Sequence, residues 1–407
     1  MAKPHIITGL DIGSSSVKIL SAYKAPKSDD FEVVSQAQEM SFGVRKGVVI
    51  DVRKTADIIG SLVKKTGEEA KQRVRGVYAS IDGGHISCAC SHGLVSVSRA
   101  DRKISEEDVD RVIQAAKTFF VPSNKEIIDI YPRDFTVDGE KGVKEAVGME
   151  GVRLEADILM LYCFSPYLKN SSQTILNSGL QINDLIPAPL ASSRAVLAPR
   201  EKELGTVVLD IGAGTTGMAV FEEGGLIDFA VFPVGSGHIT NDIAVCLKTD
   251  IDTAEKIKLE FGICKTISPE ARKQLKKKVK LQGEELLVFS PKTLTEIIEA
   301  RVGEIFGFVN KELKKISRQA LLPAGAVLTG GGANLPGIKD TAKRMLRLPC
   351  RIGVPRQFRS LPENPAFSTL CGLVMLGEET EEESGNFSGF GKGFKNKLKG
   401  LFRAFVP

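Results

Sequence analysis

The stretch that decides the fold is residues 10–20, LDIGSSSVKIL, because a second version of it, LDIGAGTTGMAV, occupies residues 209–220. Each version reads as a strand, a turn of small residues, and apolar residues that return at strand spacing, which predicts a β-hairpin. The shared letters LDIG can arise by chance, but the matching turns and apolar flanks favour a true repeat. Two hairpins about 200 residues apart therefore indicate a chain built from two related halves.

The two hairpin turns have the composition of phosphate-binding loops. Residues 14–16 (SSS) and 214–216 (GTT) let the backbone approach a ligand, and their N–H and hydroxyl groups can donate to phosphate oxygens. Asp11 and Asp210 precede the turns, and two carboxylates across a cleft suit Mg²⁺ with its waters. Lys18 can reach a phosphate as a point charge. The alternative interpretation is that each aspartate only closes a tight turn.

A third turn fits the other end of a nucleotide. Residues 328–337, LTGGGANLPG, place three glycines after an apolar strand, which leaves room for a flat ligand against bare backbone. Glu255 and Lys258 are spaced i, i+3 on a predicted helix over 253–262 and can clasp a ribose or a base edge. The alternative for this pair is a solvated helix face.

The rest of the chain predicts further elements around these motifs. A helix is expected over 57–64 and a long amphipathic helix over 293–316. Residues 84–162 predict a compact βαββ-like insert. Its helix begins with a capping box formed by Ser105 and Asp108. The apolar face of that helix comprises Val109, Val112, Ile113 and Ala116.

Composition limits the class of protein. A chain of 407 residues has room for two to four domains, and a net charge of +5 gives no reason to expect a nucleic-acid partner. Seven cysteines fit free thiols in a reducing cytoplasm. Cys88 and Cys90 could ligate metal, but alternate positions on one strand face are the preferred interpretation. The N-terminus shows no signal peptide. The sequence contains no apolar run of about 18 residues, the length that would predict a membrane span.

The C-terminal region changes character. Residues 378–391 are acidic and then rich in glycine and serine, which predicts a flexible linker. Apolar residues then recur at helical spacing between lysines and arginine, a pattern typical of a helix that lies in an anionic membrane surface. A helix docked on the body or in a partner's groove is the alternative. The apolar positions are Phe394, Leu398, Leu401, Phe402 and Phe405.

These motifs together resemble the actin–hexokinase–Hsp70 ATPase family. Within it, the chain resembles the FtsA family of bacterial cell-division actin homologues over essentially its whole length. The similarity is carried by GLDIGSSSVK (9–18), VVLDIGAGTTGMAVF (207–221), FPVGSGHITNDIA (232–244), AEKIKLEFG (254–262), GAVLTGGGANLPGI (325–338) and the tail. Ser236 stands where the family pattern has glycine, which puts a detail of the interdomain loop in doubt.

The resemblance implies an α/β, actin-like fold: a duplicated, ribonuclease-H-like pair of domains with the nucleotide in the cleft between them. It also implies an inserted subdomain and a C-terminal amphipathic helix. The implied parts are domain 1A (1–83 and 163–204), the FtsA-type subdomain 1C (84–162), domain 2A (205–245 and 311–377), domain 2B (246–310), the flexible linker (378–391) and a membrane-targeting helix (392–407).

The resemblance also implies ATP and Mg²⁺ as ligands. The phosphate motifs carry over to Asp11, Gly13, Ser14, Ser15, Ser16, Lys18, Asp210, Gly212, Gly214, Thr215 and Thr216. The adenosine motifs carry over to Glu255, Lys258, Gly330, Gly331 and Gly332. Mg²⁺ would be held by Asp11 and Asp210 through water. The sequence identifies no catalytic base, so slow ATP turnover is the most that is expected.

The implied function is to polymerise and to tether the tubulin-like protein FtsZ to the inner face of the cytoplasmic membrane. The protein would then lie peripherally at the division site, with anionic lipids and other division proteins as partners. Arg301 matches a basic position expected to contact the FtsZ C-terminal tail, although it can instead pair with Glu304 or Glu299. A basic run in the same region has no assigned role and can be a solvated helix face: Lys273, Lys276, Lys277, Lys278 and Lys280.

Three other proteins of the same fold would explain part of the pattern. A sugar or acid kinase needs a catalytic carboxylate beside a small-molecule pocket and has no use for a membrane tail. A chaperone ATPase needs a substrate-binding domain after the nucleotide domain. An actin-like protein of pilus assembly should lack this tail. The tail therefore favours the division protein.

Overall fold

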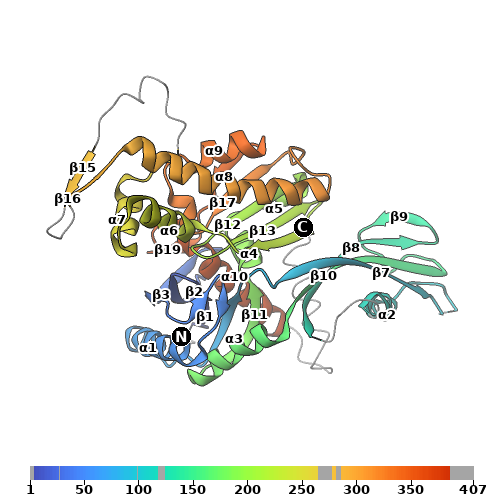
Figure 1. Cartoon of the computed structure of the whole chain (residues 1–407). Coiled ribbons are helices and arrows are strands. Elements are labelled where there is room, and N and C mark those ends of the chain that lie inside the picture. Colours follow the sequence, from blue (N-terminus) through green and yellow to red (C-terminus); the bar gives the residue numbers. More distant parts are fainter. Residues whose placement is uncertain are drawn as a thin grey trace.

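The computed structural model describes residues 4–26, 28–98, 100–117, 124–264, 277–280 and 286–385. Within them the chain forms two large sheets with helices around them (Figure 1). One sheet has the order β11-β6-β1-β2-β3-β19, and the other has the order β18-β17-β12-β13-β14-β7-β10-β8-β9. The α/β fold class expected from the sequence is confirmed.

The first sheet contains β1 (Ile7–Ile12), β2 (Ser16–Lys24), β3 (Phe31–Met40), β6 (Gly76–Ile81), β11 (Gln181–Pro187) and β19 (Phe358–Arg359). The second contains β7 (Ser87–Ser96), β8 (Lys125–Val137), β9 (Glu140–Val143), β10 (Arg153–Phe164), β12 (Thr206–Ile211), β13 (Thr216–Glu222), β14 (Gly225–Phe232), β17 (Gly325–Thr329) and β18 (Cys350–Ile352). Two small ribbons pair β4 (Val44–Arg45) with β5 (Val48–Val49) and β15 (Lys277–Lys280) with β16 (Leu286–Phe289). The α-helices are α1 (Val52–Ala70), α2 (Glu106–Lys117), α3 (Ser165–Asn177), α4 (Ala188–Val196), α5 (Pro199–Leu204), α6 (Ser236–Leu247), α7 (Ile251–Phe261), α8 (Pro291–Lys315), α9 (Ile338–Leu346) and α10 (Ser368–Gly385).

The two halves repeat the same strand arrangement, as the sequence predicts. β1 pairs antiparallel with β2 and parallel with β6, while β12 pairs antiparallel with β13 and parallel with β17. The hairpin turns close in the same way, because Gly13 N donates to Ser16 O at 3.2 Å and Gly212 N donates to Thr215 O at 2.9 Å. The repeat in sequence is therefore a repeat in structure.

The insert is built on β7, β10, β8 and β9, with α2 against one face (Figure 1). It joins the second sheet through the pairing of Ala230 with Ser87. The predicted capping box of α2 is present, since Ser105 N donates to Asp108 Oδ2 at 2.9 Å and the Asp108 N–H donates back to Ser105 Oγ. The predicted βαββ pattern gains one short strand, β9, so the insert is βαβββ. Cys88 occupies one of the alternate positions on β7 and its thiol contacts Asp228 of β14.

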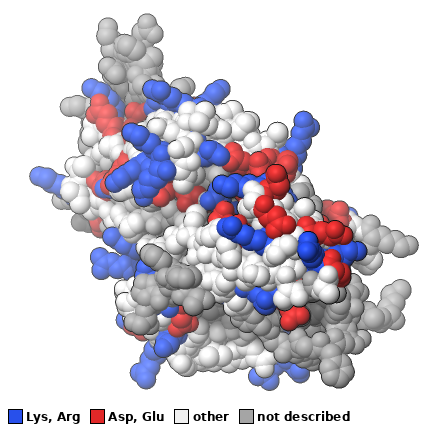
Figure 2. All heavy atoms as spheres, turned by 90° about the vertical axis from the view of Figure 1, so that its right-hand side faces the viewer, with Lys and Arg blue, Asp and Glu red and all other residues white. Residues whose placement is uncertain are grey.

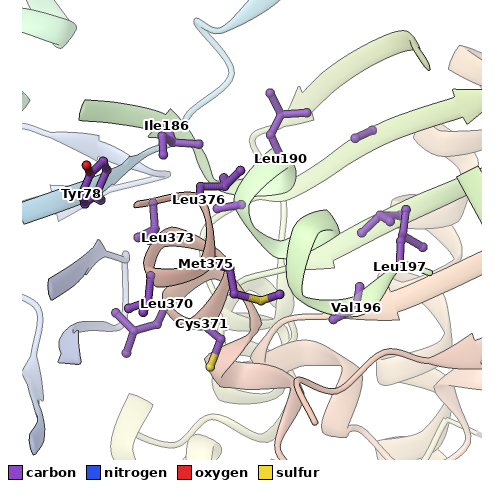
Figure 3. Close-up of a cluster of buried hydrophobic side chains, with 14 of the residues drawn as sticks. Tyr78, Ile186, Leu190, Val196, Leu197, Leu370, Cys371, Leu373, Met375 and Leu376 are labelled. Atoms are coloured by element: carbon purple, nitrogen blue, oxygen red, sulfur yellow. The ribbon is translucent and has the colours of Figure 1, made fainter. Parts of the chain in front are cut away.

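α10 joins the halves through an apolar cluster, part of which is shown in Figure 3. Leu370, Leu373 and Leu376 of α10 are buried with Leu190 of α4, and α10 also contacts β1, β2 and β6. The cluster therefore belongs to both halves. Burial of large aliphatic side chains at this density supplies most of the stability of such a core.

The predicted linker begins too early. α10 continues through Gly385, because acidic residues beyond 377 find basic partners on the first half. Glu379 pairs with Arg194 of α4, and Lys24 of β2 donates to Glu382 at 3.0 Å. The acidic composition of this segment predicted a flexible linker. Ion pairs with residues of the first half instead keep its beginning helical. Residues 386–391 and the five apolar tail positions lie outside the described residues.

The predicted helices are otherwise confirmed with longer bounds. The helix expected over 57–64 is α1, which begins earlier because Asp51 caps it by accepting from Lys54 N at 3.0 Å. The helices expected over 253–262 and 293–316 are α7 and α8. One interpretation of the basic run from Lys273 to Lys280 is a solvated helix face. That interpretation is wrong for Lys277, Lys278 and Lys280, because these residues lie in the strand β15. Lys273 and Lys276 lie outside the described residues.

Charged side chains of both signs are interspersed on the face seen in Figure 2. That mixture agrees with the small net charge of +5. None of the described helices combines the length and the apolar character needed to cross a membrane.

Candidate functional site

A cavity of about 1300 Å³ lies between the two halves, where both hairpin turns open. It gathers nearly every nucleotide-binding residue predicted from the sequence. The predicted residues that line it are Asp11, Gly13, Ser14, Ser15, Ser16, Lys18, Asp210, Gly212, Gly214, Thr215, Glu255, Lys258, Gly330, Gly331 and Gly332. Both hairpin turns, the glycine turn and the pair on α7 therefore converge on one site.

Asp11 is held by two donors at the end of β1. Lys18 Nζ donates to its Oδ2 at 3.1 Å, and Ser80 Oγ donates to its Oδ1 at 2.8 Å. The Lys18 side chain lines the cavity and is only 15% exposed, so its charge is shielded from bulk solvent. Ser80, on the neighbouring strand β6, has no motif of its own and was missed in the sequence.

Asp210 occupies the matching position in the second half. Thr369 of α10 donates to its Oδ2 at 2.7 Å. Burial and, to a smaller extent, the nearby charge of Asp11 raise the pKa of Asp210 to about 6. Two carboxylates that repel each other in a desolvated cleft form a donor set that fits a hard, oxygen-binding cation such as Mg²⁺. Thr369 was also missed, because it lies about 160 residues further along the chain from Asp210.

Glycine is required at Gly330 beside this carboxylate. Its φ of +79° favours glycine, and a Cβ at this position would lie 2.3 Å from Asp210 Oδ1. The glycine turn therefore packs its backbone directly against the second aspartate. This explains why a motif near residue 330 and a motif near residue 210 line the same cavity.

The two phosphate-type turns meet across the cleft. A Cβ at Gly214 would lie 2.5 Å from Ser14 Oγ, and Gly47 N donates to that same oxygen at 2.8 Å. Thr216 does not line the cavity, contrary to the prediction. Its side chain is buried and donates to Val234 O at 2.8 Å, because strand alternation turns it away from Thr215 and into the domain.

Asp82 is a site residue that the sequence did not reveal. It follows β6 and lines the cavity, where the Thr215 hydroxyl donates to its Oδ2 and the Gly83 N–H donates to its Oδ1 at 2.8 Å. Burial raises the pKa of Asp82 to about 7, despite these two donors. The only signal in the sequence is an aspartate between a strand and a glycine pair, which usually indicates a turn.

The other end of the cavity is formed by α6 and α7. Lys258 Nζ lies 2.7 Å from Glu255 Oε2 and donates to Thr240 Oγ1 at 2.9 Å. The Lys258 side chain is 10% exposed. The alternative of a solvated helix face is therefore wrong for Lys258. The hydroxyl of Ser236, at the unusual family position, donates to Gly212 O at 3.1 Å and ties α6 to the phosphate-type turn.

Arg301 lies on α8, away from the cavity lining. Its Nε and Nη2 donate to the two carboxylate oxygens of Asp242 at 2.7 and 2.8 Å, and Nη1 contacts Glu304. The intrahelical pair with Glu304 is thus present. The bidentate ion pair with Asp242 of α6 was not predicted from the sequence. The alternative partner Glu299 instead pairs with Arg344 at 3.5 Å.

The repeated halves and the cavity between them define the actin-like ATPase class. Among solved structures, the chain is similar to the PilM–PilN type IV pilus biogenesis complex at 18% identity and a TM-score of 0.63, covering 91% of this chain and 98% of that one. It is also similar to MreB5 of Spiroplasma citri bound to ADP, at 13% identity and a TM-score of 0.57, covering 94% and 99%. At these identities the likeness shows the fold.

The family follows from the sequence comparisons. Residues 207–372 match the family model for cell division protein FtsA, and residues 83–162 match the SHS2 domain inserted in FtsA. Cell division protein FtsA of Pseudomonas aeruginosa is 33% identical over 96% of this chain and 94% of its own length. FtsA of Escherichia coli K12 is 31% identical over 92% and 91%. The chain belongs to the FtsA family and is an actin-like cell-division protein.

Proposed function

We propose that the cavity binds ATP with Mg²⁺. The observation that carries this proposal is the convergence of both hairpin turns, the glycine turn and the α7 pair on one cavity. The backbone N–H groups of the two turns and the serine hydroxyls of the first turn would hold the phosphates, with Lys18 supplying positive charge. Asp11 and Asp210 would hold Mg²⁺ through water, and the metal would neutralise phosphate charge.

The nucleoside would lie at the α7 end of the cavity. The fixed Lys258 and Glu255 pair offers a donor and an acceptor to ribose hydroxyls, while Gly331 and Gly332 leave a bare surface for the base. Thr216 has no direct part in this arrangement. Its hydroxyl bond to Val234 instead fixes the strand that carries Thr215.

We further propose that the protein polymerises and tethers FtsZ to the inner face of the cytoplasmic membrane at the division site. Membership of the FtsA family and the basic, apolar pattern of the tail support this function. Each basic residue near an anionic leaflet contributes about 1 kcal/mol, so one short helix binds reversibly. Several tails on one filament would bind far more tightly, since each further contact is intramolecular. Assembly and membrane attachment would then reinforce each other.

The division of the chain into domains 1A, 1C, 2A and 2B, with the boundaries given above, is part of the same proposal. Within domain 2B, Arg301 would contact an acidic segment of the FtsZ tail. The Asp242 and Glu304 carboxylates already surround this guanidinium, so a carboxylate of the tail would replace one of them or add to the cluster. The Arg301 side chain is 24% exposed, which leaves an edge open to such a partner.

Electron microscopy on anionic lipid monolayers with Mg²⁺ and ATP tests this function. The full chain should form filaments on the lipid, whereas a chain ending at Gly385 should not reach the lipid, although it should still bind nucleotide. A full chain that is absent from the lipid would contradict the tether. A chain that binds no ATP by equilibrium dialysis would contradict the assignment of the cavity.

A further inference from the structure

Five carboxylates among the described residues line the cavity, and they fall into groups by position. Asp11 and Asp210 end the two matching strands and form the proposed metal pair. Asp252 and Glu255 lie on α7, at the nucleoside end. Asp82 remains, at the end where the two phosphate-type turns meet. A role in nucleotide binding does not account for the negative charge of Asp82, because this carboxylate would face the negatively charged phosphates.

The surroundings of Asp82 fix its orientation from both halves of the molecule. The Gly83 N–H holds Oδ1 from the first half, and the Thr215 hydroxyl holds Oδ2 from the turn of the second half. The loop before α1 closes over it, since a Cβ at Gly47 would lie 3.0 Å from Asp82 Oδ2. Two oxygens offer about four acceptor positions, so these two donors leave room for a water.

We propose that Asp82 is the catalytic carboxylate that orients and deprotonates the water which attacks ATP in this cleft. The assignment rests on the proposed binding of ATP with its terminal phosphate at the two turns. Thr215 is then a residue that both contacts the phosphate through its backbone and positions Asp82 through its hydroxyl. Asp210 also has donors in both halves, Ser192 of α4 and Thr369 of α10, but it belongs to the proposed metal pair, whereas Asp82 does not.

The step balances without a further reactant. The water oxygen forms a bond to the γ-phosphorus while the bond from that phosphorus to the β–γ bridging oxygen breaks, and the bridging oxygen leaves with the electron pair on ADP. The water proton passes to the Asp82 carboxylate. That proton is later lost to solvent or to the released phosphate. Burial supports the role, because a pKa raised to about 7 lets the carboxylate accept a proton near neutral pH.

The histidine in the cavity is a poorer base. His238 Nδ1 already accepts from Gly235 N at 3.1 Å, at the start of α6. Its pKa is lowered, first by burial and then by the Arg301 charge, so the neutral ring is a weak proton acceptor. These contacts tie His238 to its own helix, and they leave the hydrolytic role to Asp82.

The test compares the full chain with its Asp82→Asn variant, using ATP, ADP and Mg²⁺. Asparagine keeps the shape and one acceptor but takes up no proton. Hydrolysis should fall by about 10²-fold or more, and ATP should be recovered intact from the bound state. Loss of a charge beside the γ-phosphate should also tighten ATP binding severalfold while ADP affinity changes little. The affinity ratio is a readout that a purely structural role would not move.

Asp228→Asn is the matched control. Asp228 of β14 is also buried with a raised pKa, but its neighbours are Cys88 and Phe229, away from the cavity. This variant should hydrolyse ATP at the native rate. Thermal unfolding of both variants checks that each is folded, and Thr215→Val, which removes only the positioning hydroxyl, should lower the rate by a smaller factor.

The outcomes separate the two proposals. Native chain that fails to bind ATP overturns the proposed function and this inference with it. Native chain that binds ATP but returns it unhydrolysed overturns the inference alone. An Asp82→Asn variant that hydrolyses ATP within about threefold of the native rate, with unchanged nucleotide affinities, also overturns the inference, since a general base contributes at least 10²-fold.

Discussion

Gly372 of α10 and Ala191 of α4 bring two helix backbones into direct contact. A Cβ at position 372 would lie 1.7 Å from the carbonyl oxygen of Ala191. α4 borders the cavity through Ala188 and Pro189, and α10 borders it through Thr369. This helix crossing therefore fixes both walls of the site as well as the core seen in Figure 3.

Gly372→Ala should destabilise the protein strongly. The added methyl group must push α10 and α4 apart, and overpacking in a close-packed core costs about 1–3 kcal/mol or more. The midpoint of thermal unfolding should fall by several degrees. Gly60→Ala in α1 is the control, because nothing lies within 4 Å of its Cβ position. There alanine should stabilise the helix by up to about 1 kcal/mol. Equal midpoints for the two variants would contradict the crossing.

His85 should make the fold sensitive to acid. It lies in the segment between β6 and β7, its ring is packed edge-on against Tyr167, and burial lowers its pKa to about 4. A lowered pKa means that the folded state resists protonation. The contribution of the neutral His85 ring to the free energy of unfolding is therefore fully present above about pH 6.5. It is lost as the pH falls towards 4. Urea unfolding at pH 7.5 and 4.5 should show a smaller loss for His85→Leu than for the native chain.

His92→Gln provides the comparison for that experiment. His92 is exposed on the insert and contacts Glu155 and Asp157. Its replacement should leave the acid-dependent loss close to that of the native chain, because the ring is half exposed and is not part of the core. A His85→Leu variant with the full native loss would show that the buried ring is not responsible.

Asp242 and Arg301 should affect the binding of FtsZ in opposite directions. Asp242→Asn removes the carboxylate that occupies the Arg301 fork, so a synthetic peptide of the acidic FtsZ tail should bind more tightly. Arg301→Gln should weaken the same peptide by about tenfold, as expected for a lost charged hydrogen bond. Fluorescence anisotropy of a labelled peptide measures both. Weaker binding for both variants would indicate that the pair only supports the fold.

Phe402→Glu should release the full chain from anionic liposomes. It places a charge on the apolar face of the predicted tail helix and removes an aromatic ring whose burial in the lipid would be worth about 1.5–3 kcal/mol. Phe402→Leu keeps the face apolar and should still co-sediment. Native levels of co-sedimentation for the glutamate variant would contradict the membrane-binding role of the tail.

Most of the cavity could be predicted from the sequence because its residues are carried by local motifs. A hairpin turn brings its own backbone donors, so Ser14 and Gly214 were recognisable from neighbouring letters alone. Thr216 was misassigned because strand alternation, and not the motif, decides which side chain faces the ligand. Ser80, Asp82 and Thr369 were missed because each reaches the site from a distant segment.

By itself, the sequence determined the duplicated halves, the order of elements and the kinds of ligand atom at each turn. These depend on short-range patterns of small, apolar and charged residues. Only the tertiary structure decided that α10 stays helical to Gly385, that Arg301 is forked to Asp242, and that Asp82 meets Thr215 across the cleft. Each of those contacts joins residues that are far apart in the chain. The energy of such a contact depends on burial and on distance, and neither can be obtained from the order of residues alone.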